Sequence, residues 1–95
     1  MLLIWHDNAV EDLAGIRDYI ANDNPTAATR VAARIRTGLL TLTDYPRMGR
    51  PGRVPETREF VFADIPYIAV YHIDEDRRTL EILHIIHTAQ FYPRE

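Results

Sequence analysis

Cysteine, lysine and long apolar runs are all missing from this sequence. Without cysteine the chain can form no disulfide and no thiolate metal site, and it has no thiol nucleophile, which fits a reducing cytoplasm. Its apolar runs span only a few residues, far short of the roughly 20 that cross a bilayer, and no basic region precedes the first of them. We therefore expect a cytoplasmic protein with no membrane segment and no targeting signal.

The charge balance argues against a surface tuned as a whole to bind nucleic acid. The formal net charge is −3 and the pI is about 5.7, whereas such surfaces carry a large basic excess. With 46% hydrophobic and 26% charged residues, residues 1–95 are expected to form one domain with one modest core. A chain this short buries only about 60 to 65% of its unfolded surface, so a partner can add substantially to its stability.

A short strand and then a helix are predicted at the start of the chain. Residues 2–5 are apolar and tolerate β structure, and Asn8 with Glu11 has the spacing of a reciprocal capping box. Apolar residues then recur at steps of three and four as far as residue 20. This pattern predicts an amphipathic helix whose polar outer face carries Glu11, Asp12, Arg17 and Asp18.

A second helix is predicted from Pro25 to about Pro46. Asn24 can cap it, and a proline at the first helical position has no amide hydrogen to lose. Only residues 22–24 separate the two helices, so they must pack antiparallel. Gly38 costs about 1 kcal/mol relative to alanine inside a helix, which indicates a tight contact there.

The second half of the chain predicts a loop followed by an antiparallel meander. Residues 46–57 hold three prolines and two glycines, so neither a helix nor a regular strand is expected. The runs 58–63, 66–73 and 79–87 are rich in β-formers. The predicted fold class is α+β in the order β-α-α-β-β-β, with the helical hairpin packed on one face of an antiparallel sheet. In the middle run one face is expected to hold Tyr67, Ala69, Tyr71 and Ile73, and the other Ile68, Val70 and His72.

An ordered set of residues spread along the whole chain carries a resemblance to a known family. Its members are Trp5, Ala9, Asp12-Leu13, Ile16, Tyr19-Ile20, Asn24-Pro25, Ala28, Ile35, Leu42, Pro46, Gly49-Arg50, Pro55, Thr57-Arg58-Glu59, Pro66-Tyr67, Tyr71, Leu80, Ile82, Ile85 and His87. In spacing and order this set resembles the RelE/ParE family of bacterial toxins, and particularly its ParE-like branch.

The resemblance implies a toxin of a type II toxin-antitoxin system, associated with plasmid stabilisation. It implies a neighbouring antitoxin gene, a toxin-antitoxin hetero-oligomer and no cofactor. ParE-like members poison DNA gyrase without catalysis, whereas RelE-like members cut messenger RNA on the ribosome. A third alternative is a degenerate module that only binds its antitoxin, and expression without the antitoxin would distinguish it because growth would not be impaired.

The residues weigh against the nuclease alternative. A metal-free ribonuclease needs a base, an acid and cations around the phosphate, and the candidates are Arg58, Glu59 and His87. Arg58 and Glu59 are neighbours on a predicted strand, so they point to opposite faces unless a bulge intervenes. RelE-like nucleases use an arginine after the last strand, and this position resembles Gln90 here. We therefore favour a gyrase poison.

The basic loop is a candidate surface for the antitoxin or the target, although a solvated loop would have the same composition. Residues 46–58 contain four arginines and one acidic residue, Glu56, which leaves a local excess of three positive charges. We expect the antitoxin to follow the groove between the hairpin and the sheet, with its acids meeting Arg50, Arg53 and Arg58. The full set of candidate binding residues is Arg47, Arg50, Arg53, Arg58, Phe91 and Tyr92.

The histidines and tyrosines are expected to be structural. His84 and His87 are an odd number of residues apart on a strand, which places them on opposite faces. A turn centred near Asp76 would set His72 opposite Leu80 and leave no third ligand, so no metal site is predicted. The tyrosines are interpreted as core or sheet-face residues rather than as a base-stacking platform: Tyr19, Tyr67 and Tyr71.

Overall fold

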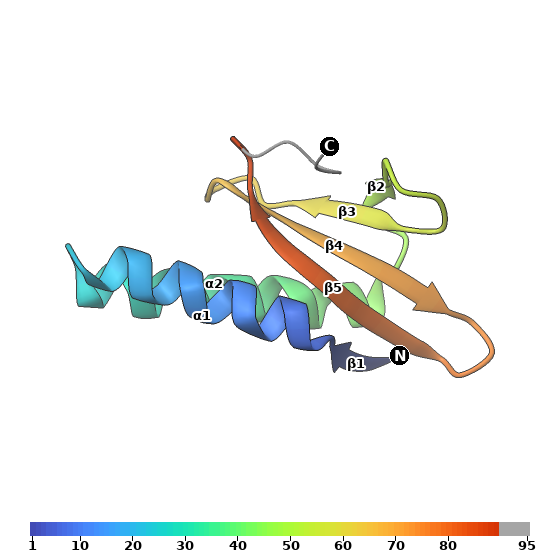
Figure 1. The fold of residues 1–95 in the computed structure, drawn as a ribbon. Helices are drawn as coiled ribbons and strands as arrows, with labels where there is room; N and C mark the ends of the chain where they lie inside the picture. The colour runs from blue at the N-terminus through green and yellow to red at the C-terminus, as the bar shows by residue number, and fades with distance from the viewer. Residues whose placement is uncertain (90–95) are drawn as a thin grey trace.

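The computed structural model describes residues 1–89, and these form two helices and five strands (Figure 1). The sheet has the order β1-β5-β4-β3-β2, and the helical hairpin lies along one of its faces. The predicted contacts of Phe91 and Tyr92, and the position of Gln90, fall outside the described residues. The elements are β1 (Leu2–Trp5), α1 (Asp7–Ala21), α2 (Pro25–Asp44), β2 (Arg50–Pro51), β3 (Arg58–Val61), β4 (Tyr67–Asp74) and β5 (Thr79–His87).

The predicted fold class is confirmed, with one addition to the sheet. Strands β3, β4 and β5 form the expected antiparallel meander, whereas β1 pairs with β5 in parallel, from Leu2 opposite Thr79 to Trp5 opposite Ile82. The sheet is therefore mixed. The alternation of apolar residues predicts which face of a strand is buried, but it carries no information on the direction of its neighbour.

Both helix starts use a side-chain cap, and one of the two caps was predicted correctly. Asn24 caps α2, since its Oδ1 accepts a hydrogen bond of 3.0 Å from the Ala27 amide. The capping box at Asn8 is wrong: the cap lies two residues earlier, at His6, whose Nδ1 accepts from the Asn8 amide at 3.1 Å. The His6 amide also donates to the Ile82 carbonyl at 2.9 Å, so β1 passes directly into the helix cap.

The loop contains one short strand that was not predicted. Arg50 and Pro51 pair with Glu59 and Arg58, which makes β2 the far edge of the sheet. Proline is tolerated at an edge because no neighbour needs its missing donor. None of the helices within residues 1–89 is long and apolar enough to span a membrane.

The two faces of β4 are used as the alternation predicts. The side chains of Tyr67, Ala69 and Tyr71 join the core under the helices, while Ile68 and Val70 are buried on the opposite face. A register shift between Val70 and Tyr71 accommodates one extra residue of β5. The hairpin turn spans residues 75–78, so His72 lies opposite Glu81 and not opposite Leu80 as predicted.

Gly38 marks a tight contact, as its position inside α2 indicates. A Cβ atom there would overlap the ring of Phe62, which is buried and packs edge-on against Phe60. Gly15 in α1 is the opposite case, because a Cβ atom there would meet nothing within 4 Å in the part of the chain that the structure describes.

Alanine at these two helical glycines is expected to change stability in opposite directions. Gly15→Ala raises the free energy of unfolding by about 1 kcal/mol, the difference in helix propensity. Gly38→Ala lowers it by about 1 to 2 kcal/mol, because overpacking against Phe62 exceeds the same helical gain. Urea unfolding of both variants measures the difference, and stabilisation of the chain by both would contradict the assigned contact.

Candidate functional site

The arginine-rich loop is fastened to the sheet through the carboxylate of Glu59. Arg50 donates to Oε1 through Nε at 3.2 Å and Nη2 at 3.0 Å, and the Arg53 amide donates to Oε2 at 3.2 Å. The Arg53 guanidinium lies 3.9 Å from the same oxygen. Glu59 is only 2% exposed, so a buried charge is matched by two arginines and a backbone donor.

Arg58 organises the backbone of the same loop. Its Nε donates to the Gly49 carbonyl at 2.9 Å and its Nη2 to the Arg47 carbonyl at 3.1 Å. The Arg47 side chain forms an exposed ion pair with Glu75, an arrangement that adds little stability. Of the four predicted arginines, the loop therefore uses Arg50, Arg53 and Arg58 for its own structure.

The hydroxyl of Tyr71 is the second anchor of the loop. It donates to the Pro46 carbonyl at 2.6 Å and accepts from the Gly49 amide at 3.0 Å. Burial raises the pKa of Tyr71 above its ordinary value, although the hydrogen bond from Gly49 and the charge of Arg58 oppose the shift. The hydroxyl therefore stays neutral and keeps the proton that it donates.

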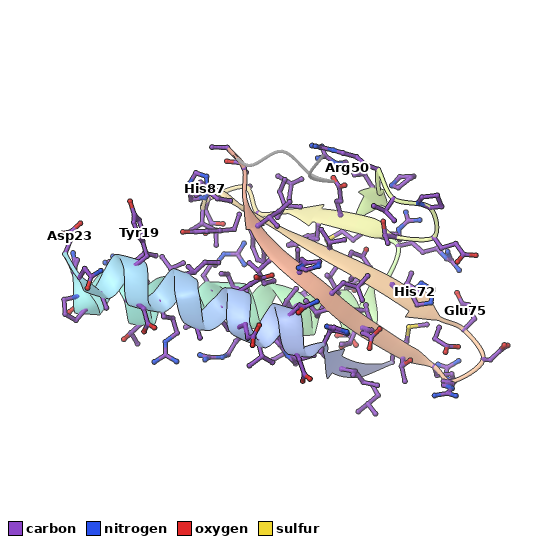
Figure 2. The ribbon with its side chains drawn as sticks, viewed as in Figure 1. Tyr19, Asp23, Arg50, His72, Glu75 and His87 are labelled. Carbon is purple, nitrogen blue, oxygen red and sulfur yellow. The ribbon has the colours of Figure 1, made fainter. Side chains whose placement is uncertain are left out.

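The three nuclease candidates are not brought together. Arg58 lies opposite Tyr71 and Glu59 opposite Val70, so these neighbours face opposite sides of the sheet, as predicted. His87 lies opposite Tyr67. Tyr67 is four residues before Tyr71, the partner of Arg58, which is a displacement of about 13 Å along β4. Figure 2 shows His87 where β5 ends, while His72 and Glu75 mark the other end of the sheet.

The histidines have separate hydrogen-bond partners. The Nδ1 of His72 lies 2.9 Å from the Glu56 carbonyl, and the Nδ1 of His87 accepts from the Ala89 amide at 3.0 Å. The His87 ring also packs edge-on against Tyr67, with centroids 5.4 Å apart. Within residues 1–89, no three histidine or carboxylate side chains gather as ligands for one metal ion.

Asp12 anchors α1 to the sheet, a role that the amphipathic pattern did not predict. Its Oδ2 accepts from the Ile85 amide at 3.0 Å and lies 3.1 Å from the Nδ1 of His84. The pairing of β1 stops at Ile82, and Asp12 meets the edge of β5 just beyond that point. Its assignment to the outer face of the helix was therefore wrong, because a one-dimensional pattern does not show where a neighbouring strand ends.

A groove of about 620 Å³ lies between α1 and the end of β5. Tyr19 stands on its rim and is 78% exposed, so its expected place in the core or on the sheet was wrong, whereas Tyr67 and Tyr71 are core residues as predicted. Burial, and then the nearby Tyr19, raise the pKa of Tyr67. The groove is lined by Glu11, Asp12, Gly15, Ile16, Tyr19, Tyr67, Ile85, His87 and Ala89.

Loss of the Tyr71 hydroxyl is expected to destabilise the chain and to change its response to alkali. Tyr71→Phe leaves the Gly49 amide and the Pro46 carbonyl without this partner, at a cost of about 1 to 3 kcal/mol. Because folding raises the pKa of Tyr71 above 10.0, its contribution is complete below about pH 10 and falls as pH rises through the folded value. Urea unfolding at about pH 8 and about pH 11 tests both effects, and an equal alkaline loss in the two proteins would contradict the second.

Neutralising Glu59 is expected to loosen the loop. Glu59→Gln removes the buried negative charge that attracts two arginines, and it lowers the free energy of unfolding by about 2 kcal/mol. Glu56 is exposed, so Glu56→Gln changes the free energy of unfolding by less than about 0.5 kcal/mol. Thermal unfolding measures both variants. Equal stability of the two would show that Glu59 does not anchor the loop.

Comparison with known proteins identifies the family. A family model described as the ParE toxin of the type II toxin-antitoxin system, parDE, matches residues 3–92. Toxin Y4kP of Sinorhizobium fredii is 48% identical over 90 residues, which cover 95% of this chain and 91% of that protein. Toxin RelE2 of Caulobacter vibrioides is 35% identical over 88 residues, covering 93% and 96%.

A solved structure agrees with this assignment. The chromosomal ParDE toxin-antitoxin system from P. aeruginosa contains a chain that superposes with a TM-score of 0.80 at 27% identity, covering 92% of this chain and 95% of that one. The chain therefore belongs to the ParE toxin family, and it is the toxin component of a type II toxin-antitoxin system.

Proposed function

We propose that this toxin is a non-enzymatic inhibitor of DNA gyrase, held inactive in a hetero-oligomer with its cognate antitoxin. The supporting observation is that the residues which nuclease chemistry would need form hydrogen bonds within the chain. Arg58, Glu59 and His87 all bond to other groups of the chain, and the residues of β4 that lie opposite Arg58 and His87 are four positions apart.

Each of these residues is poorly suited to phosphate chemistry for a specific reason. A general base must reach the 2′-hydroxyl that it deprotonates, whereas Glu59 is buried and accepts hydrogen bonds on both oxygens. Arg58 directs two of its nitrogens to backbone carbonyls. The net charge of −3 also disfavours a general affinity for RNA.

Family membership supports gyrase as the target, because ParE-like toxins poison this enzyme by binding to it. Inhibition by binding requires a complementary surface and no assembled catalytic residues. The relative named RelE2 supports the alternative, a ribosome-dependent endoribonuclease. A degenerate module that binds only the antitoxin is the third possibility, and the experiment below separates all three.

The loop arginines remain candidates for antitoxin contact, in a narrower sense than the sequence suggested. The side chains of Arg47, Arg50 and Arg53 keep 66%, 54% and 48% of their surface exposed. A partner's acids can reach these exposed parts, but reversal of charge at Arg50 or Arg53 would also break their ion pairs with Glu59. A weakened complex therefore implicates direct contact only when the loop is shown to remain folded.

Pulse labelling of DNA and protein synthesis after induction of the toxin alone tests the target. We expect DNA synthesis to fall within minutes, with filamentation, before protein synthesis changes. His87→Ala should remain toxic because no bond chemistry depends on it, and Arg58→Ala should lose toxicity only to the extent that its loop unfolds.

Two other outcomes would replace the proposal. Early collapse of protein synthesis with cut messenger RNA, abolished in His87→Ala, would establish the nuclease alternative. Normal growth of cells that contain the folded chain would indicate the degenerate module. Circular dichroism and co-purification with the antitoxin confirm that each variant is folded.

A further inference from the structure

Gly15 differs from the other three glycines, because no close contact among the described residues requires glycine at this position. All four glycines lie within residues 1–89. At Gly38, Gly49 and Gly52 a Cβ atom would collide with Phe62, Tyr71 and Thr57, whereas at Gly15 it would meet no atom of the described residues within 4 Å. Glycine is unfavourable inside a helix, so the open space above Gly15 calls for an explanation outside the chain.

The space above Gly15 belongs to the groove between α1 and the end of β5. Gly15 lines that groove together with Glu11, one turn earlier, and Tyr19, one turn later. These positions, four residues apart, lie along one side of the helix. A side chain at residue 15 would narrow the groove at its middle, and glycine allows an external segment to approach the helix backbone.

The groove combines acidic and aromatic groups. Glu11 is exposed on its rim, and Asp12 stands beside it with one carboxylate oxygen engaged by the sheet. Tyr19 and Tyr67 present aromatic rings, and among residues 1–89 no arginine lines the groove. Figure 2 shows Tyr19 rising from α1 on the side where His87 ends β5. Carboxylates next to tyrosine rings attract a cationic side chain through both charge and cation–π interaction.

The other flank of α1 has the opposite character. A groove of about 280 Å³ there is lined by Trp5, Val10, Leu13, Ala14, Arg17 and Arg36. The two sides of the helix therefore carry charges of opposite sign. Of the two grooves, the one over Gly15 is the one that attracts a basic side chain.

We propose that the groove over Gly15 receives an arginine or lysine side chain of the cognate antitoxin, with the flanking antitoxin backbone lying close to α1. The occupant is assigned to the antitoxin because it is the partner that the toxin-antitoxin role requires, and because a groove of this volume accommodates a few side chains of one segment. The inference rests on the antitoxin part of the proposed function and is independent of the gyrase target.

The first test fills the groove. Gly15→Leu places a large side chain at its middle, and Ala33→Leu adds the same side chain at an exposed site on α2. Binding to the purified antitoxin encoded beside the toxin gene is measured by fluorescence anisotropy. We expect Gly15→Leu to weaken binding at least about tenfold with no loss of thermal stability, and Ala33→Leu to change it less than about threefold. Equal affinity of the two variants would overturn the proposal.

The second test reverses the charge. Glu11→Arg and Asp18→Arg change the net charge equally on the same helix, but only Glu11 lines the groove. Glu11→Arg should weaken antitoxin binding about tenfold and reduce its dependence on salt, while Asp18→Arg should not. Alanine substitution of each basic antitoxin residue, combined with Glu11→Gln, then identifies the inserted side chain by its coupling energy.

Failure of this inference can be distinguished from failure of the gyrase proposal. If no basic antitoxin residue couples to Glu11, the assigned occupant is wrong whatever the toxin's target. If the Gly15→Leu variant binds antitoxin normally but no longer inhibits gyrase, the groove belongs to the target, which also overturns the assignment. A nuclease result in the labelling experiment would leave the binding measurements and their interpretation unchanged.

Discussion

The buried anchors of the arginine-rich loop determine how the rest of this molecule can act. The Tyr71 hydroxyl holds the loop where it leaves α2, and the Glu59 carboxylate holds it where β2 joins the sheet. Each anchor is a buried polar group, so its bonds are costly to break. Arginines supply the bonds to Glu59. A basic segment, whose composition would suit phosphate binding, is therefore used to fasten β2 and its loop to the sheet.

The other end of the sheet is held differently. Strand β1 covers the edge of β5 only as far as Ile82, and Asp12 then binds the next part of that edge. This carboxylate adds a polar contact between α1 and β5 to the apolar packing of Ala9 and Leu13 in the core. The groove floored by Gly15 and flanked by Tyr19 lies beside this contact. The residues at one end are therefore used for internal bonds, while the groove at the other end is the surface that we propose for the antitoxin.

Much of the fold follows from local patterns in the sequence. The helical hairpin, its cap at Asn24, the meander and the buried face of β4 depend on periodicity and turn chemistry, which are properties of short segments. The tight contact at Gly38 was predictable because glycine within a helix is less stable than alanine, which favours a site where a side chain would not fit. The ordered residues along the chain also predicted the family.

The site could be predicted only in part, because it depends on contacts between distant residues. Composition indicates that the loop is basic, but not that Arg50 and Arg53 turn toward Glu59. The amphipathic pattern assigned Asp12 to solvent, since nothing in the sequence shows that β1 stops where Asp12 begins to contact β5. The parallel direction of β1 was missed for the same reason, because it requires knowing which strand lies beside it. The cap at His6 is a local contact and was missed because the capping-box spacing pointed to Asn8 instead.

The stoichiometry of inhibition distinguishes a non-enzymatic inhibitor of gyrase from a nuclease. Purified gyrase is titrated with the purified chain while DNA supercoiling is measured, and translating ribosomes are titrated in parallel while messenger RNA cleavage is measured. We expect supercoiling to be lost as the chain approaches stoichiometric amounts, with messenger RNA intact. Unaffected gyrase at a large excess of the chain, together with messenger RNA cut at substoichiometric amounts, would contradict it.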